Sequence, residues 1–209
     1  MRANTPFTPP QGFRVLPDAL DRAAQEQLLA EVAAVIEAAP LFIPTLPRIG
    51  QPMTVRMTNS GPLGWVTDRD GGYRYQATHP TTGAPWPPIP PLALALWRSF
   101  SGYRHDPEAC LVNFYGAEAR MGLHLDKDEA ALEAPVLSIS LGDTALFRLG
   151  GPDRKAPTRS LKLASGAVVV LGGAARACYH GVDRILAGSS RLLEGGGRLN
   201  LTLRRVTLP

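Results

Sequence analysis

Residues 198–204 read RLNLTLR, a run in which polar and apolar side chains alternate without exception. Successive side chains of a β-strand point to opposite faces, so a strand here would carry three leucines on one face and the polar residues on the other. The leucine face predicts contact with a hydrophobic core. The polar face, made of Arg198, Asn200, Thr202 and Arg204, has two interpretations: a solvated outer surface, or the lining of a polar interior in which arginine clamps a small dicarboxylate.

Other short runs with strand-like composition precede this one in the second half of the chain. They cover residues 110–115, 136–141, 145–149, 160–163 and 167–171. The run that contains residues 198–204 continues to residue 206. Glycine-rich turns separate several of them. Short strands at such spacing predict a sandwich or a barrel. We therefore expect an α+β, mainly β fold with a jelly roll at its core.

The first half of the chain has a different pattern. The Pro-rich residues 1–17 predict irregular structure, and Asp18 is a candidate N-cap for an amphipathic helix over residues 20–36. Residues 40–91 hold many of the 20 prolines and predict loops and hairpins, including a lid, rather than a layer of the core. A second helix is expected over residues 92–100.

Length and composition fit one compact unit. With 209 residues, of which 44% are hydrophobic, the chain can bury one substantial core. Residues 1–105 would supply the helical layer and the lid, and residues 106–209 the jelly roll. The net charge of +4 is too small to establish a nucleic-acid partner by itself. No run has the length and apolarity of a membrane span or a secretory signal, so we expect a cytoplasmic protein whose Cys110 and Cys178 are reduced.

The tripeptide His124-Leu125-Asp126 places an imidazole and a carboxylate two residues apart. On a strand both side chains would project from one face and offer two ligands to a metal ion. His180 is the candidate third ligand, which would complete a two-histidine, one-carboxylate triad of the kind that holds non-haem iron and leaves coordination positions open. Zinc accepts the same ligands, so the triad by itself leaves iron and zinc open.

Further motifs lie in order across residues 50–206. They are Met57-Thr58-Asn59, Gly64-Trp65, Tyr73-Arg74-Tyr75, Asn113-Phe114-Tyr115, His124-Leu125-Asp126-Lys127-Asp128-Glu129, residues 136–142, Gly172-Gly173, Tyr179-His180-Gly181 and residues 198–204. Together they make the chain resemble the AlkB family of oxidative demethylases. The resemblance implies a double-stranded β-helix with helices packed on one side and a β-hairpin lid for nucleotide recognition.

The resemblance also implies that the triad holds Fe(II), with 2-oxoglutarate and dioxygen as co-substrates. The positions that contact 2-oxoglutarate in the family match Asn113, Tyr115, Arg198, Asn200 and Arg204. These side chains can donate hydrogen bonds to carboxylates, although Tyr115 is equally compatible with a core aromatic. We assign Arg198 to the distal carboxylate and expect Arg204 to lie near Asp126. A site for this dicarboxylate is the reason to prefer iron over zinc.

The family removes methyl groups from base nitrogens. The implied function is therefore the repair of N-alkylated bases, of the 1-methyladenine and 3-methylcytosine type, in single-stranded DNA and also in RNA, by a monomeric enzyme. Such an enzyme holds an unstacked base between aromatic or apolar side chains. The candidate substrate contacts are Met57, Trp65, Tyr73, Tyr75, Asp128 and Arg154. Trp65 is expected to stack the base against His124. Simple packing of the lid is the alternative for the lid residues, and the favoured one for Met57, while Asp128 and Arg154 could be solvated charges.

Two positions depart from the bacterial repair enzymes of the family, which have aromatic residues where this chain has Leu171 and Cys178.

Two other functions stay open. One is a 2-oxoglutarate-dependent hydroxylase or demethylase of protein or small metabolites, which would turn over without nucleic acid. The other is a non-catalytic metal-binding or nucleic-acid-binding jelly roll with zinc in the triad, in which iron and 2-oxoglutarate would not bind together.

Overall fold

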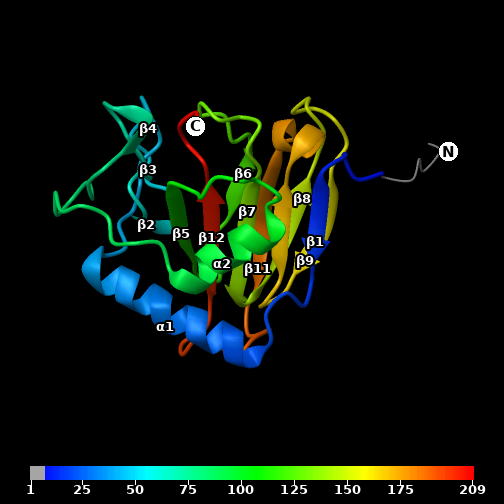
Figure 1. The fold of residues 1–209 in the computed structure, drawn as a ribbon, viewed down its shortest axis with the longest axis horizontal. Coiled ribbons are helices and arrows are strands. Elements are labelled where there is room, and N and C mark those ends of the chain that lie inside the picture. The colour runs from blue at the N-terminus through cyan, green and yellow to red at the C-terminus, as the bar shows by residue number, and fades with distance from the viewer. Residues whose placement is uncertain (1–7) are drawn as a thin grey trace.

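Two antiparallel sheets form the centre of the molecule, and two helices cover the larger sheet (Figure 1). The computed structural model describes residues 8–209. The helices are α1 (Arg22–Ala38), α2 (Pro91–Phe100) and the short 3-10 helix η1 (Gly173–Ala177). The strands are β1 (Phe13–Leu16), β2 (Arg56–Ser60), β3 (Gly64–Asp68), β4 (Gly72–Gln76), β5 (Ala109–Tyr115), β6 (Met121–His124), β7 (Val136–Gly142), β8 (Thr144–Leu149), β9 (Arg159–Leu163), β10 (Val168–Leu171), β11 (His180–Leu186) and β12 (Arg198–Arg204).

The larger sheet has the order β1-β10-β7-β12-β5-β2, and the smaller has the order β6-β11-β8-β9. With the exception of the consecutive pair β8–β9, neighbouring strands of the two sheets are distant in sequence, as in a jelly roll. One apolar cluster fills the space between the sheets, and another lies between the larger sheet and the helices. Strands β3 and β4 form a separate hairpin, which stands to one side of the sheets in Figure 1. The predicted mainly β architecture with helices on one side is confirmed, and the hairpin is present, while its role as a lid stays a prediction.

Strand β12 occupies a central position in the larger sheet, between β7 and β5. Its leucines Leu199, Leu201 and Leu203 pack in the cluster that contains the apolar residues of both helices. All seven of its residues are buried, including both arginines. The polar face therefore lies inside the molecule, and the interpretation of that face as a solvated surface is wrong.

Two predictions for the first half of the chain were also wrong. Strand β1 falls within the segment expected to be irregular, and it pairs with β10 at one edge of the larger sheet. The remainder of that prediction, for residues 1–7, lies outside the described residues. Strand β2 falls within residues 40–91, yet it pairs with β5 at the opposite edge and buries Met57. Both are edge strands, positions where nearby prolines are tolerated.

The N-cap of the first helix lies three residues later than predicted. Asp21, and not Asp18, is its N-cap, because the Asp21 carboxylate accepts a hydrogen bond from the backbone N–H of Ala24 at 2.8 Å. The helix buries Leu28, Val32 and Val35 against the sheet. The second helix covers residues 91–100, as expected.

Replacing Asp21 with alanine should lower the free energy of unfolding by about 1 kcal/mol, the usual loss for an N-cap carboxylate. The Asp18→Ala variant is the matched control, since it removes the same side chain from a position that caps nothing. It should change stability by less than about 0.5 kcal/mol. Urea unfolding of the two variants measures the difference, and equal midpoints would contradict the assignment of Asp21 as the cap.

Both cysteines are buried and unpaired. Cys110 belongs to the cluster beneath the helices and Cys178 to the cluster between the sheets.

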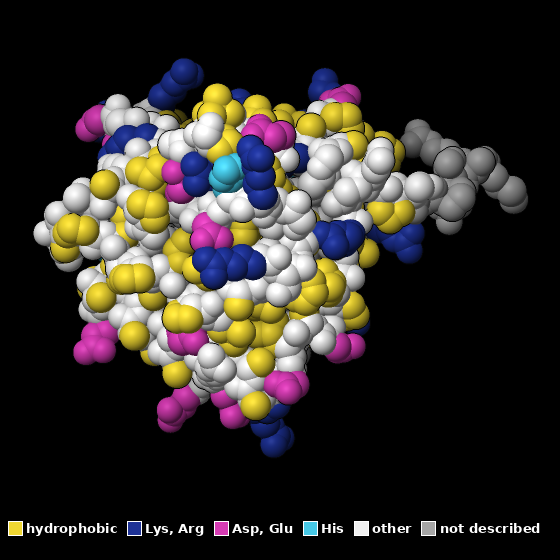
Figure 2. Space-filling model, in the orientation of Figure 1, with side chains coloured by type: hydrophobic (Ala, Val, Ile, Leu, Met, Phe, Trp, Pro, Cys, Tyr) yellow, Lys and Arg dark blue, Asp and Glu magenta, His cyan; other side chains and the backbone are white. Residues whose placement is uncertain are grey.

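Within residues 8–209, neither helix combines the length and the hydropathy that a membrane-crossing segment requires. On the helix-covered face, acidic and basic side chains are interspersed among apolar ones (Figure 2).

Candidate metal and cofactor site

Two histidines that are far apart in sequence are direct neighbours across a strand pair. His124 ends β6 and His180 begins β11, and the two residues are paired in the register of these strands. Their ring centroids lie 4.5 Å apart. Gly181 permits this approach, because a Cβ atom there would lie only 2.6 Å from the backbone oxygen of Met121. The register of the smaller sheet thus creates one side of the site.

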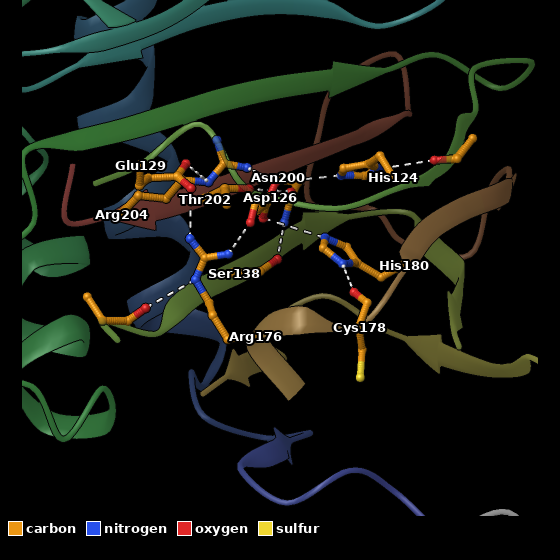
Figure 3. A network of polar contacts seen from close by, with 12 residues as sticks. His124, Asp126, Glu129, Ser138, Arg176, Cys178, His180, Asn200, Thr202 and Arg204 are labelled. Atoms are coloured by element: carbon orange, nitrogen blue, oxygen red, sulfur yellow. Dashed lines mark hydrogen bonds and ion pairs between the residues drawn. The ribbon is translucent and has the colours of Figure 1, made fainter. Parts of the chain in front are cut away.

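The third member of the triad, Asp126, lies beyond the end of β6 rather than on it. The strand argument for a shared face was therefore wrong in its geometry, although the two side chains do converge. Arginines hold Asp126 in place instead. Arg204 Nη2 donates to Asp126 Oδ1 at 2.8 Å, and Arg176 Nη1 donates to the Asp126 backbone oxygen at 2.5 Å (Figure 3).

The donor atoms of the triad are close enough to share one ion. His124 Nε2 lies 3.8 Å from Asp126 Oδ1, and His180 Nε2 lies 3.6 Å from Asp126 Oδ2. Two atoms that each bond one ion at about 2.1 Å can be at most about 4.2 Å apart. Ligand atoms of all three residues lie within 4.8 Å of one another, so the widest pair has to close by at most about 0.6 Å when one ion binds all three. No other cluster of three such residues occurs among residues 8–209.

Both imidazoles are held in the tautomer that a metal requires. The Nδ1 atom of His124 faces the carbonyl oxygen of Gly122 at 2.9 Å, and that of His180 faces the carbonyl oxygen of Cys178 at 3.1 Å. A carbonyl only accepts, so each Nδ1 carries the proton and each Nε2 presents its lone pair. Burial lowers the pKa of His180 to about 4, so this ring is neutral at physiological pH.

Asp126 is the anionic member of the triad. Burial is the largest single influence and acts to raise the pKa of its carboxyl. The charges of Arg204, His180, His124 and Arg176 together outweigh burial, so the pKa lies well below its usual range. The Asp126 Oδ2 atom is buried and accepts no hydrogen bond from any residue that the structure describes. A buried, ionised oxygen without a donor fits a metal ligand.

A cavity of about 670 Å³ extends from the triad into the space between the sheets and out to the hairpin β3–β4. This is the size of a typical small-molecule site. With the exception of Tyr75, every residue predicted for the metal, cofactor or substrate lines it, including the exposed Arg154 at its edge and the buried Met57. Tyr75 lies behind this wall, with its hydroxyl directed at Glu129.

Arg198 lies in the cavity wall as a buried cation without a carboxylate partner. Its residue is 1% exposed, and its Nη2 donates to Ser140 Oγ at 3.0 Å. The Nε and Nη1 groups have no acceptor. Its guanidinium lies 5.3 Å from the ring centroid of Tyr115, and burial lowers its pKa. An unpaired charge is costly to bury, so this site fits an anionic ligand such as a carboxylate.

Asn200 is more fully satisfied than its predicted cofactor role requires. Its amide nitrogen donates to Ser138 Oγ at 2.6 Å and to the Ile139 backbone oxygen at 3.0 Å, and its oxygen accepts from Thr202 Oγ1. Because Ser138 accepts here, its own hydroxyl hydrogen is available to the cavity that it lines. Ser138 was not predicted, since an isolated serine in a strand carries no signal.

The lid places an aromatic pair at the outer end of the cavity. Trp65 on β3 and Tyr73 on β4 stack with ring centroids 5.6 Å apart. The Trp65 indole donates to the carboxylate of Asp128 at 2.9 Å, which fixes the tilt of the ring. The predicted substrate residues Trp65, Tyr73 and Asp128 therefore lie together on one side of the opening.

Two charged residues that the sequence did not single out support the triad from behind. Glu129 and Arg176 are both buried, and Arg176 Nη2 lies 2.7 Å from Glu129 Oε2. Glu129 belongs to a recognised motif but was given no role, and Arg176 on η1 lies in an alanine-rich segment without any pattern. Only the folded chain brings these residues together.

Comparison with known proteins agrees with a site for iron and 2-oxoglutarate. Residues 12–204 match the model of the 2OG-Fe(II) oxygenase superfamily. The chain is 56% identical to the alpha-ketoglutarate-dependent dioxygenase AlkB homolog of Caulobacter vibrioides, over 96% of this chain and 90% of the relative. It is 42% identical to the DNA N(6)-methyladenine demethylase ALKBH1A of Arabidopsis thaliana, over 42% of this chain and 25% of that one. The solved structure of OsALKBH1 superimposes with a TM-score of 0.76 at 30% identity, covering 96% of this chain and 99% of the other.

Proposed function

The chain belongs to the AlkB family of the 2OG-Fe(II) oxygenase superfamily, and from this premise we propose that it demethylates N-methylated bases of nucleic acid. It is an Fe(II)- and 2-oxoglutarate-dependent dioxygenase and an oxidative demethylase. The non-catalytic alternative is therefore wrong. Our proposal concerns the substrate: 1-methyladenine and 3-methylcytosine type lesions in single-stranded DNA, with RNA as a second polymer, so that the enzyme acts in repair of alkylation damage.

We assign the metal to His124, Asp126 and His180, whose unprotonated donor atoms converge. Bound there with 2-oxoglutarate, Fe(II) supplies the activation of dioxygen that hydroxylation of a methyl group needs. The overall reaction converts the methylated base, dioxygen and 2-oxoglutarate into the unmethylated base, still attached to its strand, with formaldehyde, succinate and carbon dioxide. The buried cavity excludes bulk water from this chemistry.

We assign one carboxylate of 2-oxoglutarate to Arg198, because its two unused N–H groups are the donors that such a group would satisfy. Tyr115 and Asn113 line the same part of the cavity, where Asn113 Oδ1 is buried without a partner. Asn200 lines it too, and its amide holds Ser138 in position. Arg204 is assigned to the opposite end, where it holds Asp126.

The single observation that carries the substrate proposal is the aromatic pair at the cavity opening. Trp65 offers an apolar ring whose polar edge is already bonded to Asp128, so its face is free to stack on an unstacked base. His124 lines the same cavity, as the predicted sandwich of base between Trp65 and His124 requires. Asp128 keeps lone pairs for an exocyclic amino group, and the exposed Arg154 is placed to meet a phosphate.

Formaldehyde release from a panel of oligonucleotides tests the proposal. The panel would carry 1-methyladenine, 3-methylcytosine or N6-methyladenine in single-stranded DNA, duplex DNA and RNA, with Fe(II), 2-oxoglutarate and ascorbate supplied. We expect release from the first two lesions in single-stranded DNA. Succinate formation without formaldehyde from any oligonucleotide would reject a nucleic-acid substrate and favour a protein or metabolite substrate instead. A cytoplasmic location and a monomeric state stay predictions.

A further inference from the structure

Glu129 is the most deeply buried carboxylate beside the metal site, with a side chain that is 1% exposed. Glutamate is almost never buried to this degree unless it is paired. Arg176 Nη2 donates to its Oε2 atom at 2.7 Å, and Arg204 Nε lies 3.5 Å from Oε1. The hydroxyl of Tyr75 donates to the same Oε1 atom. Tyr75 is the only one of these partners that comes from the lid.

The two arginines that hold Glu129 also hold the metal ligand. Arg204 donates to the Asp126 carboxylate, and Arg176 donates to its backbone oxygen, as Figure 3 shows. Glu129 and Asp126 are thus joined through a shared pair of guanidinium groups, and the four charges sum to zero. A displacement of Glu129 would change the contacts of both arginines and, through them, the position of Asp126.

Two lid residues tie the lid to this network. Trp65 on β3 donates to Asp128, while the hydroxyl of Tyr75 on β4 donates to Glu129 and accepts from Arg204 Nη1 at 3.4 Å. Both acceptors belong to the short segment that carries two of the metal ligands, residues 124–129. The two tethers differ in their surroundings, because Asp128 is exposed whereas Glu129 is buried. Burial raises the pKa of Tyr75 above its ordinary value, which keeps the hydroxyl protonated as a donor.

We propose that Tyr75 is a positioning residue that latches the β3–β4 lid to the metal ligand Asp126 through Glu129 and the two arginines. This rests on the proposed function, since it gives the lid a role in holding a base over the metal. The lid adopts its closed position when Asp126 is in place, and a lid that opens loosens the support of Asp126. Tyr75 therefore affects the reaction without touching the substrate.

The Tyr75→Phe variant tests the latch, because it removes the hydroxyl and little else. Tyr103→Phe is the matched control, since its hydroxyl also donates to a glutamate, Glu133, at 2.9 Å but lies exposed and belongs to neither the cavity wall nor the lid. The measurement is hydrogen exchange of residues 64–76 in the full chain, with and without Mn(II) and 2-oxoglutarate. Mn(II) is the probe because it can occupy the site without turnover.

In the wild type, Mn(II) and 2-oxoglutarate should slow amide exchange across residues 64–76. In Tyr75→Phe this protection should fall by about tenfold or more, as expected when the hydrogen bonds of the hydroxyl to the charged Glu129 and Arg204 are lost. In Tyr103→Phe it should stay at the wild-type value. Protection that persists in Tyr75→Phe, or that falls equally in both variants, would overturn the proposal.

A second readout separates the latch from a merely structural role. With a substrate identified from the oligonucleotide panel, Tyr75→Phe should raise the ratio of succinate to formaldehyde, because the lid no longer keeps the base in place while the cofactor reacts. An unchanged ratio would count against the latch. The exchange experiment requires no substrate, so a loss of protection in Tyr75→Phe combined with no demethylation of any oligonucleotide would uphold the latch and reject the substrate assignment alone.

Discussion

The Asp126→Asn variant should lose Fe(II)-dependent turnover while it keeps its fold. The amide has nearly the same shape and its oxygen can still accept from Arg204 Nη2, which now bonds Asp126 Oδ1 at 2.8 Å. What it lacks is the negative charge of the triad. Removing an outer-shell partner of a metal ligand typically costs about 10-fold to 100-fold in metal affinity or activity, and loss of the ligand itself should exceed that range.

An anaerobic titration with Fe(II) and 2-oxoglutarate checks this result, because the metal and keto acid together give a charge-transfer absorption band. Asp128→Asn is the matched control, since it makes the same chemical change two residues away, in a carboxylate that bonds Trp65. The control should develop the band and Asp126→Asn should not. A band of wild-type intensity in Asp126→Asn would exclude this aspartate as the ligand.

The sequence was informative about this site where the pattern was local. Strict alternation in residues 198–204 required only that the segment be a strand, and β12 has those limits. The two histidines were identifiable as candidate ligands, but their pairing depends on the register of β6 with β11. Strand β11 itself was not predicted, because a register shift after His180 interrupts its alternation. A strand that contains such an irregularity loses the period on which recognition rests.

Other features were decided by partners that no local pattern reveals. Strand β2 was expected among loops and hairpins outside the core because its flanks are rich in proline, whereas its pairing with the edge of β5 places it in the larger sheet. The Arg176–Glu129 pair joins residues 47 positions apart. A single arginine or glutamate gives no sign of its burial, since most are solvated. The second layer of the site therefore became visible only in the structure.

The two arginines of β12 should respond in opposite ways to the same substitution. Arg204→Met removes the partner of Asp126 and one neighbour of Glu129, which leaves buried carboxylates undercompensated. Breaking a buried pair in this way typically costs about 3–5 kcal/mol of stability. Arg198→Met instead removes a buried cation that has no carboxylate partner among the described residues, at the loss of one hydrogen bond to Ser140. The apo-protein should therefore become more stable, by about 1–3 kcal/mol.

The gain in Arg198→Met should be accompanied by a loss of cofactor binding. Two charge-assisted hydrogen bonds, each contributing about 1.5–3 kcal/mol, correspond to a weakening of 2-oxoglutarate binding by roughly 10²-fold to 10⁴-fold. Urea unfolding with and without Mn(II) and 2-oxoglutarate measures both effects. With Mn(II) present throughout, 2-oxoglutarate should stabilise the wild type by about 2.7 kcal/mol at a concentration 100 times its wild-type Kd, and Arg198→Met by less than about 0.5 kcal/mol. If the apo form of Arg198→Met is less stable than the wild type, the Arg198 guanidinium stabilises the fold and the prediction is wrong. If it is more stable, as we expect, the buried charge of Arg198 lowers the stability of the apo-protein and is compensated when 2-oxoglutarate binds.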